Sequence, residues 1–168
     1  MSPRVPPPSA LVPPVALALL VVAAGCAGPL LGGPPETTVE NSASDEYRVD
    51  VYTVPVDDPA ALEFSRATDG GRRPLDARDV QFPSGERNVT LDNEGATLQR
   101  RVVLAPGENV TATLDGWNRG ETTVYLVETA DERLVYTRVV DCGSGDQSHT
   151  LTVESNESFR ASSTCGGF

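Results

Sequence analysis

The stretch Tyr47-Arg-Val-Asp-Val-Tyr-Thr-Val54 decides the fold class of this chain. Its odd-numbered positions hold a tyrosine, two valines and a threonine, whereas the charged Arg48 and Asp50 fall at even positions. A period of two places alternate side chains on opposite faces of a strand. The stretch therefore predicts a half-buried β-strand, which ends at Pro55 because proline cannot donate to a sheet ladder.

Short alternating runs recur along most of the chain. No window after the leader shows a convincing helical period over about 11 residues or more. About eight to ten short strands at roughly ten-residue spacing are typical of an antiparallel β-sandwich. The other runs expected as strands are 37–40, 62–64, 80–82, 88–91, 98–104, 109–114, 122–129, 133–140, 151–153 and a last one around Phe159.

Two turn motifs separate the strands in the middle of the chain. A turn over 92–95 closes with Asn93-Glu-Gly95, and the next strand ends in Leu104-Ala-Pro-Gly-Glu108. Proline presets an early turn position, and glycine is free to take a positive φ. With these motifs, the run from Val89 to Cys142, about a third of the chain, resembles the immunoglobulin-like domains common on archaeal surface proteins. The resemblance implies an immunoglobulin-like β-sandwich and says little about function.

The chain begins with an apolar leader, Val15-Ala-Leu-Ala-Leu-Leu-Val-Val-Ala-Ala-Gly-Cys26. About ten apolar residues match the core of a secretory signal and fall short of the roughly 20 that span a bilayer. The end of the run resembles the lipobox of exported lipoproteins, which implies a signal peptide over 1–25 and a lipid on the Cys26 thiol. An ordinary signal peptide with an incidental cysteine and an uncleaved anchor are the alternatives. No twin arginine precedes the run, so the export route stays open.

Residues 26–45 are expected to form a lipidated, flexible tether, and residues 46–168 the β-sandwich domain. Gly-Gly and Pro-Pro pairs in the tether disfavour regular structure. One lipid chain holds a protein only marginally, so stable anchoring implies a lipid with two chains. The expected location is the outer face of the cell membrane.

The composition is strongly acidic. The formal net charge is −11, and the 13 basic residues are all arginine, with no lysine. This composition resembles that of haloarchaeal proteins, in which a carboxylate-rich surface stays hydrated in concentrated salt. An acidic protein of a GC-rich genome is the alternative. Either interpretation disfavours nucleic acid as a partner, since an acidic surface repels phosphate.

Two cysteines remain after Cys26, and they are expected to form a disulfide. Cys142 and Cys165 are an even number of thiols in an exported chain. A bond that closes a loop of this length stabilises a fold by roughly 3 kcal/mol. A metal site is the alternative, but it needs two more ligands, and only His149 is nearby. We therefore expect no metal.

Three sequons indicate possible N-glycosylation sites, and they are the one modification motif that recurs in the sequence. Asn88, Asn109 and Asn156 each begin an N-x-[ST] triplet without proline. The valines that follow the first two asparagines are expected to face the core, so Asn88 and Asn109 should face solvent. Chance occurrence in a chain rich in threonine and serine is the alternative.

The side chains that could carry catalysis do not form a convincing set. His149, with Ser148 and either Asp141 or Asp146, would supply the residue types of a hydrolase triad, but no G-x-S-x-G turn is present. Blue-copper chemistry needs two histidines and a cysteine, and the chain has a single histidine. We expect His149 to be exposed in a polar loop. Neither an enzyme nor a cofactor is expected.

Other polar and aromatic residues have ordinary explanations. The acidic pairs Asp57-Asp58 and Asp131-Glu132 do not follow a calcium-loop pattern and are expected to be solvated surface. Trp117 is expected to cap the core, with sugar stacking as the alternative. Tyr52 falls on the polar face of its strand and is the better candidate for an exposed aromatic.

Three functions remain, in order of preference. The first is a structural or protein-interaction module at the cell envelope, bound to the membrane through the lipid on Cys26. The second is a lipoprotein that captures a small ligand or ion for a membrane complex. An enzyme is the last. A ligand-binding protein predicts a concave pocket with convergent polar groups, whereas an interaction module predicts an exposed patch or a free sheet edge.

Overall fold

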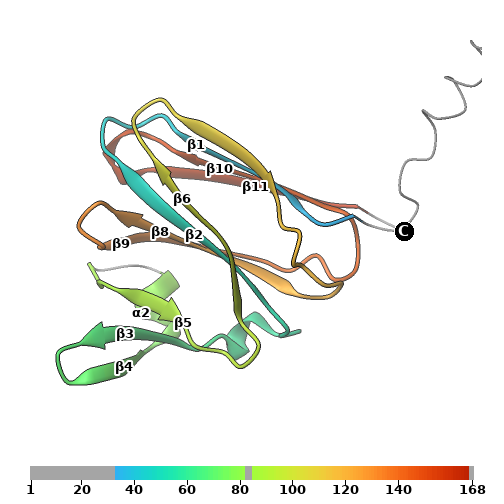
Figure 1. The fold of residues 1–168 in the computed structure, drawn as a ribbon, viewed down its shortest axis with the longest axis horizontal. Coiled ribbons are helices and arrows are strands. Elements are labelled where there is room, and N and C mark those ends of the chain that lie inside the picture. Colours follow the sequence, from blue (N-terminus) through green and yellow to red (C-terminus); the bar gives the residue numbers. More distant parts are fainter. Residues whose placement is uncertain (1–32, 82–84, 167–168) are drawn as a thin grey trace, which may run out of the picture. The chain divides into compact units, whose positions relative to one another are not determined.

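The computed structural model describes residues 33–81 and 85–166, which form three β-sheets (Figure 1). The outer sheet has the order β11 (Phe159–Cys165), β10 (Gln147–Val153), β1 (Glu36–Asn41) and β7 (Asn109–Thr113). The central sheet has the order β6 (Thr97–Leu104), β2 (Tyr47–Val54), β8 (Thr122–Thr129) and β9 (Leu134–Val140). The small sheet has the order β4 (Gly71–Leu75), β3 (Phe64–Thr68) and β5 (Val89–Leu91).

The antiparallel all-β sandwich expected from the sequence is confirmed, with one parallel pair. β1 lies between β7, to which it is antiparallel, and β10, to which it is parallel. Val39 is thus opposite Val110 on one side and Leu151 on the other. The hairpin expected over 122–140 is also present, since β8 and β9 pair directly.

The central sheet is covered on both faces. A first core between the outer and central sheets contains Val39, Val49, Val51, Tyr125, Val127 and Leu151 among others. A second core, on the other face of the central sheet, contains Tyr52, Val54, Leu62, Phe64, Val80, Val89, Leu91, Val124, Leu126 and Leu134. Strands β2 and β8 are therefore buried almost throughout, whereas the sequence pattern predicted that the 47–54 strand would be half-buried.

Tyr52 corrects a prediction. Its side chain is only 8% exposed and belongs to the second core, because β3, β5 and the helix α2 (Ala77–Gln81) cover the face of β2 that was expected to be polar. The alternation along β2 is real, but both of its faces are internal. The sequence of a single strand does not show that other segments of the chain cover its polar face.

The sandwich begins before residue 46. The strand expected at 37–40 is present and longer, as β1, and its Val39 is buried in the first core. The range 26–45 is therefore not a tether throughout, because residues 36–41 are a paired strand of the outer sheet. Residues 1–32, which include the expected signal peptide and Cys26, lie outside the described residues.

The strand expected at 80–82 is instead the end of α2. Asp76 begins the turn: its carboxylate Oδ1 accepts the Arg78 N–H at 2.9 Å. Val80 fills the second core from this helix, so the strand predicted at this position is wrong. Phe82 lies outside the described residues.

The run expected at 62–64 also begins differently. A 3₁₀ turn, η1 (Pro59–Ala61), precedes Leu62, and its N-cap Asp58 accepts the Ala60 N–H at 2.9 Å. The strand β3 starts only at Phe64. Local capping by aspartate decides both irregular segments, and it competes with strand formation.

We expect Leu126→Ala to destabilise the fold by about 2–5 kcal/mol, because it empties space in the second core beneath the small sheet. Denaturant unfolding in concentrated KCl measures the free energy of unfolding. Leu98→Ala, at an exposed position of β6, is the control and should change it by less than about 0.5 kcal/mol. Equal losses for the two variants would contradict a second core.

Candidate functional site

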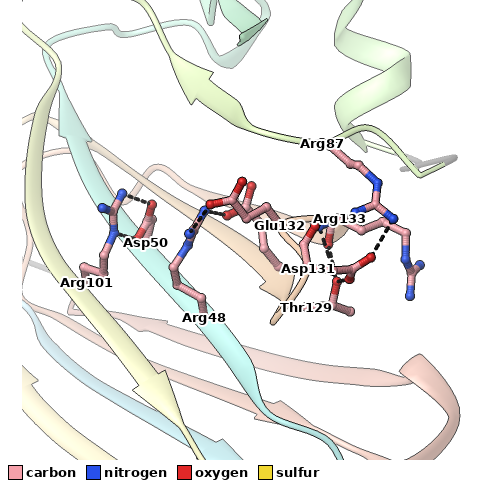
Figure 2. A network of polar contacts seen from close by, with 9 residues as sticks. Arg48, Asp50, Arg87, Arg101, Thr129, Asp131, Glu132 and Arg133 are labelled. Atoms are coloured by element: carbon pink, nitrogen blue, oxygen red, sulfur yellow. Dashed lines mark hydrogen bonds and ion pairs between the residues drawn. The ribbon is translucent and has the colours of Figure 1, made fainter. Parts of the chain in front are cut away.

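Charged side chains cross strands β6, β2 and β8 of the central sheet on the face turned away from the outer sheet (Figure 2). The sheet register places Asp50 of β2 opposite Arg101 of β6, and Arg48 opposite Glu128 of β8. The Arg101 Nε and Nη2 atoms each donate to the Asp50 carboxylate at 2.7 Å. Arg48 pairs with Glu128 and, at 3.4 Å, with Glu132 in the turn after β8. We call these five residues the arginine–carboxylate network.

The carboxylates of Asp50 and Glu128 are buried, whereas Arg48 is partly exposed and Arg101 and Glu132 are about half exposed. Glu128 is 1% exposed, and burial raises the pKa of its carboxyl, although the charge and hydrogen bond of Arg48 lower it. The hydrogen bonds of Asp50 and its negative charge raise the pKa of Arg101. Removing one partner of such a pair leaves a buried charge without compensation. The arrangement thus ties β6, β2 and β8 together in one register.

Sequence reasoning missed this network. Arg48 and Asp50 were read as the polar face of a half-buried strand, and nothing in one strand shows which charges lie opposite on its neighbours. The available signal was that Glu128 is the one charged residue in the strand predicted at 122–129. A carboxylate in such a position requires a cation on a paired strand.

The turn from Thr129 to Arg133 connects this network to the segment before β5. The Leu134 N–H donates to the Glu86 carbonyl at 2.7 Å, and the Asn88 N–H donates to the Glu132 carbonyl at 3.1 Å. Asp131 pairs with Arg87, and hydrogen bonds from Thr129 and Arg87 lower the pKa of its carboxyl (Figure 2).

The acidic pair Asp131-Glu132 is therefore bound to arginines from two segments. Its carboxylates are already neutralised, which disfavours a cation between them. Within residues 33–81 and 85–166, three or more histidine, cysteine or acidic side chains nowhere gather as a metal site would require.

A groove of about 450 Å³ runs beside β9, the last strand of the central sheet. We call it the β9 groove. One wall is the strand from Tyr136 to Val139, and the others come from η1, the start of β3 and α2. Most of its lining is apolar, and it includes Leu62, Phe64 and Val80. Arg138 contributes the one charged side chain among the lining residues that the structure describes.

His149 corrects a second prediction, because it is 3% exposed and lies inside the sandwich on β10. Its Nε2 faces the Gln147 Oε1 at 3.1 Å, and its Nδ1 faces the Tyr125 hydroxyl. An amide oxygen only accepts, so Nε2 carries the proton and Nδ1 accepts from Tyr125. Thr37 hydrogen-bonds the same hydroxyl at 2.8 Å and completes the chain.

This environment does not assemble a hydrolytic triad. Ser148 is exposed on the opposite face of β10, Asp141 accepts the Gly143 N–H at 2.9 Å, and Asp146 accepts the Gly33 N–H at 3.1 Å. Burial, followed by the positive charge of Arg138, lowers the pKa of His149 to about 4. The imidazole is thus held neutral as a core hydrogen-bonding group. Its position in a strand was missed because 147–150 is polar in sequence.

A disulfide joins Cys142, just after β9, to Cys165 at the end of β11, with the Cα atoms 5.4 Å apart. The bond thereby links the central sheet to the outer sheet. Cys165 lies opposite Gln147 in the ladder. His149 is engaged by Tyr125 and Gln147, so it does not act as a third ligand beside these sulfurs.

Two sequons are in open positions. Asn88 is exposed just before β5 and adopts a positive φ of 54°, while the following Val89 is buried. Asn109 is exposed at the start of β7, an edge strand of the outer sheet, and Val110 packs inward. The expected alternation of these residues is confirmed. Asn156 lies in the turn η2 (Ser155–Glu157), and its side chain is outside the described set.

Trp117 caps the first core, as expected. Its indole Nε1–H donates to the Glu121 carbonyl at 3.1 Å, and the ring is buried. The indole is therefore not presented for stacking on a sugar.

A family model described as halobacterial Ig domain protein matches residues 4–168. The chain belongs to this family. The match spans nearly the whole sequence and includes the sandwich described above. The immunoglobulin-like fold and the haloarchaeal character expected from turns and composition are thereby confirmed. A search of curated proteins found no match.

A comparison with solved structures found similarities of low sequence identity. The type VI secretion lipoprotein TssJ1 from Pseudomonas aeruginosa is 14% identical, with a TM-score of 0.39 over 80% of this chain and 100% of that one. The membrane-binding domain of pneumolysin is 8% identical, with a TM-score of 0.36 over 81% and 100%. A putative cell adhesion protein from Bacteroides ovatus is 12% identical, with a TM-score of 0.33 over 77% and 42%.

The described residues contain no helix with the length and apolar character needed to cross a bilayer.

Arg48→Met should lower the free energy of unfolding at pH 7 by about 3 kcal/mol, because the Glu128 carboxylate stays buried without its partner. The double variant Arg48→Met/Glu128→Leu should recover most of this loss. Arg72→Met, which breaks an exposed pair with Asp92, is the control and should cost less than about 1 kcal/mol. Denaturant unfolding measures all three. A loss for Arg48→Met no larger than the control would show that the network is not buried.

His149 should make the fold sensitive to acid. Its pKa is about 4 in the folded protein and near 6.5 when unfolded, so the unfolded chain binds the extra proton first. The stability contributed by neutral His149 is complete above pH 6.5 and is lost as the pH falls toward 4, by about 3 kcal/mol. The free energies of unfolding of wild type and His149→Gln, measured by denaturant unfolding, should therefore converge as the pH falls from 6.5 toward 4. Parallel pH profiles would refute the buried, neutral imidazole.

Proposed function

We propose that this chain is a lipid-anchored module on the outer face of the cell membrane, which works by contact with another envelope protein. Membership of the halobacterial Ig domain family and the β-sandwich fold support a binding module rather than an enzyme. The histidine that would be needed for acid–base catalysis is hydrogen-bonded inside the core. The proposed mechanism is non-covalent and uses neither metal nor cofactor.

One observation carries the proposal: the central sheet is open at both edges. Among the described residues, β6 pairs only with β2, and β9 from Tyr136 onward pairs only with β8. An edge strand presents unpaired backbone groups that another chain can extend. β6 also carries the exposed Leu98 and Val103, and β9 lies beside the β9 groove.

The anchor follows from the sequence. Cys26 ends the apolar leader in a lipobox-like motif, and a two-chain lipid there would hold the sandwich at the membrane surface. Sugars on Asn88, Asn109 and Asn156 remain part of this proposal, and none of these asparagines is among the residues that line the groove or form β6. The acidic surface disfavours nucleic acid as the partner.

A second candidate function is capture of a small ligand. The β9 groove has a volume within the range of ligand pockets, roughly 300–1,000 Å³, and combines apolar walls with the cationic Arg138. An amphipathic carboxylate would fit that chemistry.

Site-specific photo-crosslinking in the native host tests the proposed function. A photoreactive residue replaces Val103 on β6 or Val139 on β9, and Asp69 in the β3–β4 turn serves as the matched exposed control. We expect protein adducts of discrete mass in the membrane fraction from at least one edge position and none from Asp69. Intact mass of the purified protein tests for a chain that begins at a lipid-bearing Cys26.

Two results would contradict the proposal. Absence of adducts from both edges would exclude a stable protein contact at the open sheet. Unchanged membrane partitioning of a Cys26→Ser variant, together with an unmodified wild-type mass, would exclude the anchor.

A further inference from the structure

The β9 groove combines a free strand edge with an apolar depression. Along its first residues, β9 already receives an extended segment of its own chain. Arg87 forms an antiparallel bridge with Arg133, and Leu134 is hydrogen-bonded to Glu86. From Tyr136 onward no strand of the described residues takes up this edge, and α2 packs beside it instead. The groove thus lies along the same edge of β9 whose first residue already pairs with the segment at Glu86 and Arg87.

Arg138 is unusual among the arginines of this chain. Most arginines in residues 33–81 and 85–166 pair with a carboxylate. Those without such a partner there are Arg73, Arg78, Arg119 and Arg138, and the first three are exposed. Arg138 is half-buried, and its Nε atom is buried without a hydrogen-bond partner. The register places Arg138 opposite Tyr125, on the first-core face of β9, whereas Leu62, Phe64 and Val80 lie on the second-core face. Its Nε has lost water without gaining a partner, and a carboxylate from a ligand on that face would offset this cost.

The apolar lining supplies the second half of a recognition surface. Leu62, Phe64 and Val80 belong to the second core and also line the groove. Thr137 lines it too, and its hydroxyl oxygen has no hydrogen-bond partner among the described residues. Strand addition uses main-chain hydrogen bonds for affinity and pockets for alternate side chains for specificity. An edge from Tyr136 to Val139 has room for about four residues of an added strand.

We propose that the β9 groove binds an extended peptide segment of the partner protein, which adds a strand to β9, places an apolar side chain in the groove and pairs an aspartate or glutamate with Arg138. This assignment rests on the proposed function and names the partner's recognition element. The unpaired strand edge favours a peptide over a small carboxylate, because only a peptide uses the backbone groups of β9. Successive side chains of an added strand point to opposite faces, so the apolar residue faces the groove and the acidic residue beside it faces Arg138. The ion pair forms at contact distance, so concentrated salt weakens it less than it weakens long-range attraction.

Selection from a displayed library of random peptides, against the full-length protein in molar KCl, tests this proposal. Wild type should enrich segments in which an apolar residue alternates with aspartate or glutamate. Arg138→Glu should bind the best wild-type peptide about tenfold more weakly or worse, and should enrich arginine in place of the acid. Arg119→Glu removes another arginine that lacks a carboxylate partner in the described residues, far from the groove lining, and should leave the selected peptides unchanged.

A backbone test separates strand addition from side-chain binding without altering the protein. N-methylation of single peptide bonds in the best peptide removes one N–H at a time. We expect about tenfold weaker binding at alternate positions and little change between them, because only every second N–H of an added strand faces β9. Thermal unfolding of Arg138→Glu verifies that this variant is folded.

Four outcomes would overturn the proposal. Identical peptides from wild type and Arg138→Glu would exclude the ion pair, and a uniform effect of N-methylation would exclude strand addition. Binding of octanoate at the groove, with no peptide enriched, would assign the groove to a small amphipathic carboxylate. If cross-links form at Val103 while the groove enriches nothing, the contact lies on β6: the proposed function survives and this inference fails.

Discussion

Coverage of the central sheet on both faces is the constraint from which most of this structure follows. A sheet with one solvent-exposed face can carry polar side chains on that face. Here both faces of β2 and β8 are buried, so side chains on either face must fit a core. Their apolar side chains divide between the first and second cores. The charged residues on these strands, Arg48, Asp50 and Glu128, have little access to solvent, and each of them therefore needs a partner on a neighbouring strand.

The arginine–carboxylate network meets this requirement through strand register. Asp50 and Glu128 are compensated by residues directly opposite on adjacent strands, Arg101 and Arg48. A shift by one residue would turn these charges into an apolar core and leave their partners behind. The network therefore gives the sandwich specificity of pairing more than it gives net stability, which agrees with the general behaviour of buried ion pairs.

Sequence reasoning predicted what depends on local pattern and failed where a distant segment changes the environment. The strand at Tyr47–Val54, the turn at Ala105–Glu108 and the inward valines beside Asn88 and Asn109 all follow from alternation and turn chemistry. Tyr52 and His149 were placed in solvent because the covering layers, the small sheet and the facing sheet, come from elsewhere in the chain. The strand predicted at Val80 is wrong, because the Asp76 cap begins a helix there. The β9 groove and Arg138 arise from segments far apart in sequence, which no single run encodes.

The parallel insertion of β1 also sets an order of events during folding. Val39 pairs with Val110 and Leu151, so the first strand of the sandwich cannot be completed until nearly all of the chain is present. Bringing such distant segments together has a large loop-closure entropy, and topologies dominated by distant contacts fold slowly. A chain exported from its amino end would thus emerge with β1 unpaired. The outer sheet closes last, and the cross-link from Cys142 to Cys165 can then hold the finished closure in place.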